Sequence, residues 1–337
     1  MQTLSLARTP FSAHSQAVDA SAFKAYLIQA YYEPFTLNLQ DASLKEVIKA
    51  CISAKSKMHR QYRESLGCLI HNLELLEAES GVTLMPRHIT DIFWEYFISF
   101  CQDRGLKEST ICTMCNQLRS ILNWAVKYNA SVSPTYNDVR IPKPLVQEIA
   151  LTADEVSRIS YFDIDRYYSN RRQDFRDTMH RVRDMFILSC NLFQRHSDMV
   201  RIDATCFERG TFRIRQQKTG NLAVVNIERY SVDAKTTFRI LEKYNYKAPY
   251  TSTIGNYNHY LHILMRDVGF TELVRIEERK GGLIVAGNIP KWKLITSHTA
   301  RRTATTIAIL RGHNIHAVKR CTGHTDLRCL EKYVCDD

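Results

Sequence analysis

The sequence predicts a mainly α-helical protein with a small antiparallel β-meander, divided into an all-α first domain and an α+β second domain. Its 337 residues are enough for about two domains. Apolar residues recur at helical spacing along most of the chain, whereas residues 211–227 show the short β-type runs of a meander. Hydrophobic residues make up 45% of the chain, which is enough to build ordinary folded cores.

The first domain follows a weakly patterned stretch. Residues 1–42 are interpreted as an N-terminal tail, in which residues 22–32 are the one candidate helix. Ser43 and Glu46 then form a capping box, a hydroxyl and a carboxylate that satisfy the free N–H groups at a helix start. Helical periodicity continues from there, so we expect an all-α domain over residues 43–133.

A proline-containing stretch separates the two domains. Residues 134–151 have little periodicity and are interpreted as a linker, because proline removes an N–H donor and restricts the residue before it. Thr152 and Glu155 form a second capping box. The second domain is therefore expected over residues 152–337.

The second domain mixes two periodicities. A long helix is predicted over residues 173–193. Residues 211–217 and 222–227 are predicted to be short strands, joined by a turn at residues 218–221. From about Val232 to the end, the pattern is interpreted as helical again.

The charge of the chain points to a polyanionic partner. The formal net charge is +11 and the pI is near 9.1. Cations placed against phosphates release condensed counterions, but this surplus alone does not separate DNA from RNA or from an anionic membrane. No run of 18 apolar residues predicts a spanning helix, and the N-terminus lacks the apolar run of a secretory signal. Ten scattered cysteines favour reduced thiols, so a cytoplasmic protein is expected.

The sequence gives no support for metal-dependent or nucleotide-dependent chemistry. No phosphate-binding glycine loop occurs, and no cluster of carboxylates has the spacing of a two-metal site. Cys112 and Cys115 form a C-x-x-C pair without a second pair, inside a helical pattern, which favours a buried or half-buried role over zinc. We therefore expect neither a metal nor a cofactor.

Phosphodiester cleavage without a metal needs a protein nucleophile surrounded by cations and proton donors. Such groups gather near the C-terminus. Between Lys291 and Tyr333 there are nine Lys or Arg residues, two acidic residues and four histidines. His298 and Arg301 are three residues apart, so they share one face of a helix.

This stretch resembles the C-terminal signature of the tyrosine recombinases, also called phage integrases. That signature is H-x-x-R, then G-H, then a tyrosine about nine residues further on. Here it reads His298-x-x-Arg301, then Gly323-His324, then Tyr333. The stretch is similar to integrases of bacterial mobile elements, a resemblance that implies a cytoplasmic, DNA-associated bacterial protein.

Two upstream segments extend the resemblance. Residues 192–198 are similar to the family's G-L-R-x-S-E segment, with Phe193 and Gln194 in place of the usual Gly and Leu. Arg195 falls on the catalytic arginine, and Lys218 lies in the hairpin turn where the family carries its catalytic lysine. The six matching positions are Arg195, Lys218, His298, Arg301, His324 and Tyr333.

The resemblance covers about residues 43–337 and implies the two-domain tyrosine recombinase architecture. Residues 43–133 would be the core-binding, DNA-binding domain and residues 152–337 the catalytic domain. The implied activity is site-specific cleavage and rejoining of DNA through a 3′-phosphotyrosyl intermediate, for integration or excision of a mobile element. Tyr333 would be the nucleophile, and Lys218 would protonate the leaving 5′-oxygen.

The resemblance also implies roles for the other four residues. Arg195 and Arg301 would hold the non-bridging oxygens of the scissile phosphate, a geometry that suits a planar guanidinium. His298 would act as a base or proton shuttle near the tyrosine, and His324 would donate a hydrogen bond to the phosphate. The covalent link conserves the phosphodiester energy, so no cofactor is implied.

The implied partners are double-stranded DNA, further copies of this chain in a tetramer on paired sites, and accessory DNA-bending proteins, with no membrane. In the family, a further helix usually follows the tyrosine and packs against a neighbouring protomer, whereas here only residues 334–337 follow it. The basic residues expected to contact DNA are Lys55, Lys57, Arg60, Arg63 and Arg302.

Two alternatives remain open. One is a relaxing enzyme of the type IB topoisomerase kind, which uses the same chemistry on a related catalytic domain. The other is a DNA-binding protein without cleavage activity. Strand exchange between two specific duplexes, relaxation of any supercoiled plasmid, or binding alone would distinguish the three.

Overall fold

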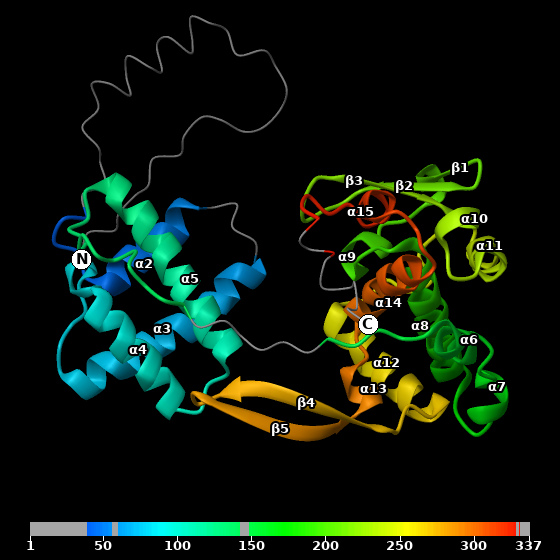
Figure 1. The fold of residues 1–337 in the computed structure, drawn as a ribbon, viewed down its shortest axis with the longest axis horizontal. Coiled ribbons are helices and arrows are strands. Elements are labelled where there is room, and N and C mark those ends of the chain that lie inside the picture. The colour runs from blue at the N-terminus through cyan, green and yellow to red at the C-terminus, as the bar shows by residue number, and fades with distance from the viewer. Residues whose placement is uncertain (1–38, 56–59, 142–147, 328–329, 331–337) are drawn as a thin grey trace, which may run out of the picture. The chain divides into compact units, whose positions relative to one another are not determined.

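The computed structural model describes residues 39–55, 60–141, 148–327 and 330 (Figure 1). The candidate helix over residues 22–32 lies outside the described residues. The chain divides into two compact units, one of residues 1–144 with 279–283 and one of residues 145–278 with 284–337. In the described part of the chain, no helix is long and apolar enough to cross a membrane.

The described residues of the first unit form four α-helices and two short 3₁₀ helices. They are α2 (Leu44–Ala54), α3 (Arg60–Ser80), η1 (Pro86–His88), α4 (Asp91–Asp103), α5 (Glu108–Ala125) and η2 (Val126–Tyr128). Helix α2 begins at the predicted capping box: the Ser43 hydroxyl accepts from the Glu46 N–H at 3.3 Å, and the Glu46 carboxylate accepts from the Ser43 N–H at 2.8 Å. The all-α prediction for this part of the chain is confirmed.

The core of the first unit is closed by aromatic residues of α4 against α5. Trp94 and Phe97 are buried, and the Trp94 indole donates to the Tyr136 carbonyl at 2.9 Å. Cys115 is fully buried and Cys112 is half-buried, so the prediction of a packing role for this pair is confirmed. Burial raises the pKa of the Cys115 thiol to about 12, which keeps it protonated and unreactive.

The second unit carries most of the secondary structure. Its helices are α6 (Ala153–Ser160), α7 (Ile164–Tyr167), α8 (Gln173–Leu192), α9 (His196–Met199), η3 (Ala204–Cys206), α10 (Ile227–Tyr230), α11 (Ala234–Lys243), α12 (Ile254–Val268), α13 (Lys291–Leu294), α14 (Ser297–Leu310) and α15 (Ile315–Thr322). Its strands are β1 (Phe207–Glu208), β2 (Thr211–Arg215), β3 (Leu222–Asn226) and the larger parts of β4 (Leu273–Lys280) and β5 (Leu283–Pro290), whose residues 279–283 belong to the first unit. The predicted capping box at Thr152 and Glu155 starts α6.

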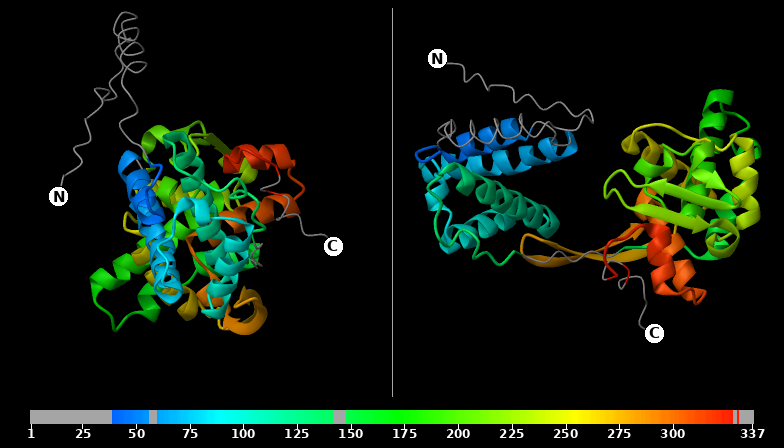
Figure 2. Two further views of the ribbon diagram at one scale, coloured as in Figure 1. Left: turned by 90° about the vertical axis from the view of Figure 1, so that its left-hand side faces the viewer. Right: turned by 90° about the horizontal axis from the view of Figure 1, so that it is seen from above.

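Helix α8 forms the centre of this unit. Residues 185–188 are buried on every side, because α6, α11, α12 and α14 all pack against this helix (Figures 1 and 2). A helical segment that is apolar on every side needs other elements to cover it. Helix α8 therefore fixes the positions of the elements around it, including α14 and the segment that follows its own C-terminus.

The predicted meander is confirmed as an antiparallel sheet in the order β1-β2-β3. Phe212 pairs with Val225 and Ile214 with Ala223, and all four side chains are buried on one face. This alternation of buried and exposed positions is what a sheet with one solvated face requires. Helix α15 packs against β3 (Figure 1).

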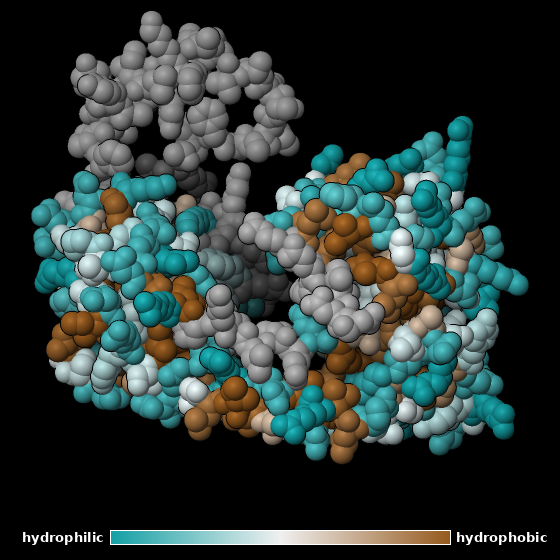
Figure 3. All heavy atoms as spheres, in the orientation of Figure 1, coloured by the Kyte–Doolittle hydropathy of each residue, from teal (hydrophilic) through white to brown (hydrophobic). Residues whose placement is uncertain are grey.

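The prediction of continuous helix from Val232 to the end is wrong for one segment. Strands β4 and β5 form a two-stranded sheet joined by Gly281 and Gly282, both at positive φ. A Gly-Gly pair between runs with β-branched residues is typical of a two-residue hairpin turn, so the signal was present in the sequence. Strand β5 exposes a run of apolar side chains, Leu283, Ile284 and Val285, and Figure 3 shows hydrophobic surface along this hairpin.

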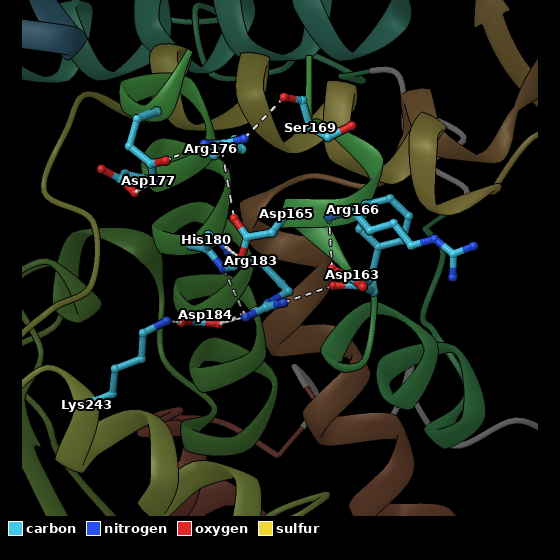
Figure 4. A network of polar contacts seen from close by, with 12 residues as sticks. Asp163, Asp165, Arg166, Ser169, Arg176, Asp177, His180, Arg183, Asp184 and Lys243 are labelled. Carbon is cyan, nitrogen blue, oxygen red and sulfur yellow. Dashed lines mark hydrogen bonds and ion pairs between the residues drawn. The ribbon is translucent and has the colours of Figure 1, made fainter. Parts of the chain in front are cut away.

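A buried carboxylate on α8 ties this helix to α11. Asp184 accepts from the Lys243 ammonium at 2.7 Å, from the Tyr244 hydroxyl at 3.0 Å and from Arg183 at 3.0 Å. Figure 4 shows Asp184 between Arg183 and Lys243. Burial alone raises the pKa of Asp184, but the two cations and their hydrogen bonds outweigh it, so the pKa lies below its ordinary value of 3.8.

We predict that Asp184→Asn lowers the free energy of unfolding at pH 7 by about 1–3 kcal/mol, because two cations lose their buried carboxylate. A carboxylate with a lowered pKa stabilises the fold above its unfolded pKa, and this contribution is lost as the pH falls through the folded pKa. The difference between the wild type and the variant should therefore shrink below pH 4 in denaturant titrations.

Asp165→Asn is the matched control, because Asp165 is an exposed partner of His180 in the same network. Its stability should stay close to that of the wild type. Equal losses in both variants at pH 7 would contradict the role given to Asp184.

Candidate active site

Arg301 is a buried cation at the centre of the candidate site. Helix α14 packs against α8 through small side chains, with Ala300, Ala304 and Ala308 all buried. Arg301 lies on the same helical face and is only 1% exposed. Because α14 packs through small apolar side chains, the Arg301 guanidinium lies in the interior. Each of its hydrogen bonds contributes to stability there.

Two neutral groups accept hydrogen bonds from Arg301. Its Nη1 donates to the Phe193 carbonyl at 3.2 Å, and its Nη2 lies 3.0 Å from His324 Nε2. A guanidinium can only donate, so Nε2 of His324 is the acceptor and the imidazole proton is on Nδ1. That proton faces the Thr322 hydroxyl at 2.8 Å. Helix α14, the end of α8 and the loop after α15 thus meet at one guanidinium.

The Phe193 carbonyl reaches Arg301 because the backbone turns sharply at the end of α8. Phe193 ends this helix in the left-handed conformation, with φ at 61°. Glycine adopts this conformation without cost, which explains why the family places Gly at this position. Here a fully buried phenylalanine occupies it. Its burial offsets a backbone strain of about 1–2 kcal/mol.

Arg195 follows two residues later and starts α9. Its side chain is half-buried, and Nη1 donates to the Gln216 side-chain oxygen at 3.0 Å. Gln216 lies at the end of β2, at the start of the turn that contains Lys218. The Lys218 side chain is exposed on that turn. Arg195 and the turn are therefore joined through the glutamine.

Gly323 makes the close approach of Gln216 possible. It ends α15 in the left-handed conformation, with φ at 65°. A Cβ at this position would lie 2.8 Å from the Gln216 amide carbon and oxygen. The glycine of the Gly323-His324 motif thus serves two purposes: it turns the backbone toward His324 and leaves room for a buried amide.

His298, one turn before Arg301 on α14, is held neutral. Burial is the largest cause that lowers its pKa, followed by the positive charges of Arg302 and Arg301, and the pKa falls to about 4. Arg195 lowers it further, and Glu148 partly opposes this effect. The local potential is therefore positive, and an imidazole that is neutral at pH 7 can accept a proton.

No protein-family model and no curated protein matches this sequence. Solved structures do match it. A lambda integrase dimer bound to a COC′ core site has a TM-score of 0.60 at 17% identity, covering 87% of this chain and 96% of that chain. A lambda integrase tetramer bound to a Holliday junction has a TM-score of 0.60 at 16% identity, covering 96% and 89%.

A Tn1549 transposon integrase in complex with a circular intermediate DNA has a TM-score of 0.57 at 12% identity, covering 87% of this chain and 95% of that chain. These matches span both units. The chain has the tyrosine recombinase fold. The predicted fold class is thereby confirmed over most of the chain.

On the tyrosine recombinase fold, four of the six predicted catalytic residues gather in one place. Arg301 bonds to His324, while Arg195 and His298 lie near enough for Arg195 to lower the pKa of His298. Lys218 is exposed on the neighbouring turn, and Tyr333 lies outside the described residues. Among the described residues, no group of three or more His, Cys, Asp or Glu is placed to hold a metal ion.

The predicted DNA contacts are only partly described. Lys55 ends α2, and Arg63 is exposed on α3. The side chains of Lys57 and Arg60 lie outside the described residues. Arg302 is half-buried and forms an ion pair with Glu148.

Sequence reasoning missed two residues of this site, Gln194 and Gln216. Both are fully buried amides, and Gln216 donates to Gln194 at 2.9 Å. The signal was the replacement of the family's Leu by Gln194. A buried amide needs hydrogen-bond partners, so a polar residue at an apolar position predicts a second polar residue opposite it.

We predict that Phe193→Gly lowers the free energy of unfolding by about 2–4 kcal/mol. It relieves the left-handed strain but leaves a cavity in the core, and the loss of the buried ring is the larger effect. Arg209→Gly is the control, because Arg209 is exposed and also has positive φ, at 46°. This control should be unchanged or stabilised by up to about 1 kcal/mol. A more stable Phe193→Gly protein would contradict this account.

A second prediction concerns the pH dependence of stability. The folded pKa of His298 is about 4 and its ordinary value is 6.5, so the unfolded chain binds more protons between these values. Stability should fall as the pH is lowered through this window. In His298→Gln the fall should be smaller, by on the order of 1 kcal/mol in denaturant titrations. His316→Gln, at an exposed histidine of α15, should follow the wild type. Parallel curves for all three proteins would refute the buried neutral state of His298.

Proposed function

We propose that this chain is a site-specific DNA recombinase that cleaves and rejoins DNA strands through a 3′-phosphotyrosyl intermediate, for integration or excision of a mobile element. The observation that carries the proposal is the meeting of Arg195, His298, Arg301 and His324, which come from separate segments of the tyrosine recombinase fold. Two guanidiniums and two imidazoles around one point suit a phosphate that gains charge during displacement.

The proposed chemistry is two transesterifications. The Tyr333 oxygen attacks the scissile phosphorus, forming a phosphotyrosyl bond while the bond to the 5′-oxygen breaks. Lys218 gives a proton to the departing 5′-oxygen, and His298 takes the tyrosine proton. Arg195 and Arg301 bind the non-bridging oxygens. Attack by a 5′-hydroxyl of the partner strand then reverses these steps without metal or ATP.

The proposed partners are double-stranded DNA and further copies of this chain. The lambda integrase structures are a dimer bound to a core site and a tetramer bound to a Holliday junction. We propose that this chain acts as a tetramer on paired sites, in the cytoplasm, with accessory DNA-bending proteins. Lys55, Lys57, Arg60, Arg63 and Arg302 are proposed contacts to the DNA backbone, and the net charge of +11 favours such contacts.

The target DNA can be found through the covalent intermediate. The protein is incubated with sheared genomic DNA and denatured, and the fragments attached to it are sequenced. A nicked suicide substrate is then made from the recovered site, so that the short 5′-flank diffuses away after cleavage and the adduct accumulates. Strand exchange between two such duplexes supports a recombinase, whereas relaxation of any supercoiled plasmid supports a topoisomerase-like enzyme.

We predict that Tyr333→Phe binds this DNA with wild-type affinity but forms no adduct on a denaturing gel, because the phenyl ring has no nucleophilic oxygen. Tyr230→Phe, at a tyrosine packed beside His313 rather than in the site, is the matched control and should form adduct normally. An adduct with Tyr333→Phe would overturn the assignment of the nucleophile. Binding without any adduct from the wild type would instead support a non-cleaving DNA-binding protein.

A further inference from the structure

The side-chain amide of Gln216 makes four hydrogen bonds although it is only 1% exposed. Its oxygen accepts from Arg195 Nη1 at 3.0 Å and from the Thr219 hydroxyl at 3.0 Å. Its nitrogen donates to the Gln194 side-chain oxygen at 2.9 Å and to the Thr322 carbonyl at 2.7 Å. Two donors and two oxygen lone pairs are the full capacity of an amide, so Gln216 is fully satisfied.

The orientation of both amides follows from their partners. A guanidinium can only donate, so the oxygen of Gln216 must face Arg195, and a carbonyl can only accept, so its nitrogen must face Thr322. Gln194 donates from its nitrogen to the Leu192 carbonyl at 2.7 Å and to the Cys321 carbonyl at 2.9 Å, which leaves its oxygen for Gln216. The Gln194–Gln216 pair can therefore adopt only one hydrogen-bonding arrangement. It links the end of α8, the turn after β2 and the end of α15.

The turn that contains Lys218 is held on both of its flanks, in part by the Gln216 amide. On one side, the Gln217 N–H donates to the buried Asp198 carboxylate at 2.8 Å. On the other side, the Thr219 hydroxyl donates to the Gln216 oxygen. Asn221, further along the turn, donates to the Gly323 carbonyl at 3.1 Å. The turn is thus fixed to the segment after α8 and to the loop of the Gly323-His324 motif.

We propose that Gln216 is a positioning residue for DNA cleavage: its amide orients the Arg195 guanidinium and holds the Lys218 turn in register with the His324 loop. This inference rests on the proposed recombinase function. A half-buried arginine has several rotatable bonds, and a bidentate contact to phosphate needs one plane of the guanidinium. Gln216 occupies a single N–H at Nη1 and leaves the other donors for the phosphate.

The test compares Gln216→Met with Gln217→Met. Methionine keeps the length of the side chain and removes all four hydrogen bonds of the amide. Gln217 is the adjacent residue in the same turn, its side chain is exposed, and only its backbone N–H contacts the site, so Gln217→Met is the matched control. Arg195→Lys gives the benchmark for complete loss of bidentate contact.

Adduct formation is followed in a single turnover on saturating nicked substrate. We expect the rate constant for Gln216→Met to fall by about 10- to 100-fold, because a displacement of about 1 Å in a phosphate ligand has an effect of this size. DNA affinity should change by less than about threefold, because many backbone contacts share the binding. The final adduct yield should equal that of Gln217→Met. A purely structural defect would lower the yield and leave the rate constant of the folded fraction unchanged.

A second measurement does not depend on cleavage. Modification of Arg195 by phenylglyoxal, followed by mass spectrometry, reports how firmly the guanidinium is held. It should be several-fold faster in Gln216→Met than in Gln217→Met. If Gln216→Met does not fold, Gln194→Leu replaces it, because Leu is the residue that the family carries there. This variant removes one partner of the amide and should shift both measurements in the same direction by a smaller factor.

The outcomes separate this inference from the proposed function. If the wild type forms adduct and Gln216→Met does so at the rate of the control, the positioning role is overturned and the recombinase function stands. If the wild type forms no adduct, the proposed function fails, and the labelling rate of Arg195 alone decides the positioning role. Equal labelling in Gln216→Met and Gln217→Met would overturn it.

Discussion

The burial of the Arg301 guanidinium is the constraint on which the rest of the site depends. A cation removed from water is stable only if acceptors surround it, and two of those acceptors are a backbone carbonyl and an imidazole. Neither acceptor reaches Arg301 through an ordinary helix or strand. Phe193 and Gly323 both adopt the left-handed conformation at a helix end, and each brings its segment toward the arginine. The left-handed conformations at the ends of α8 and α15 therefore both help to place an acceptor beside Arg301.

The buried charge also sets the electrostatics around it. The positive charges of Arg301 and Arg302 add to burial in holding His298 neutral, and the half-buried Arg195 contributes in the same direction. The same positive charge that disfavours protonation of His298 favours the binding of an anion. The buried amides Gln194 and Gln216 add hydrogen bonds without adding charge, so they can hold Arg195 without neutralising it. A carboxylate at position 216 would weaken the attraction for a phosphate, which gives a physical reason for an amide there.

Much of this fold and site could be predicted from the sequence because the signals are local. The capping boxes at Ser43 and Thr152 are four-residue patterns, and both start helices. The His298 and Arg301 spacing places both on one helix whatever surrounds it. The amide pair could not be predicted in this way, because Gln194 and Gln216 are 22 residues apart and meet only through the packing of the sheet beside α15. The β4–β5 hairpin had a local signal at Gly281 and Gly282, which the helical interpretation of the stretch from Val232 onward overlooked.

The hydrogen bond between Arg301 and His324 has a consequence for the order of events at the site. In the structure, Nε2 of His324 accepts from Arg301, so this nitrogen has no proton to give. The role proposed for His324 requires Nε2 to donate to a phosphate oxygen. An arriving phosphate must therefore separate the two side chains and be accompanied by a proton on Nε2, either by uptake from solvent or by transfer from Nδ1. The negative charge of the phosphate favours both changes, because it stabilises an imidazolium and replaces the imidazole as the acceptor for Arg301. On this proposal, Arg301 and His324 hydrogen-bond to each other until the phosphate becomes the partner of both. On the proposed function, this arrangement would let the Arg301 cation remain buried before DNA arrives and still bind the scissile phosphate.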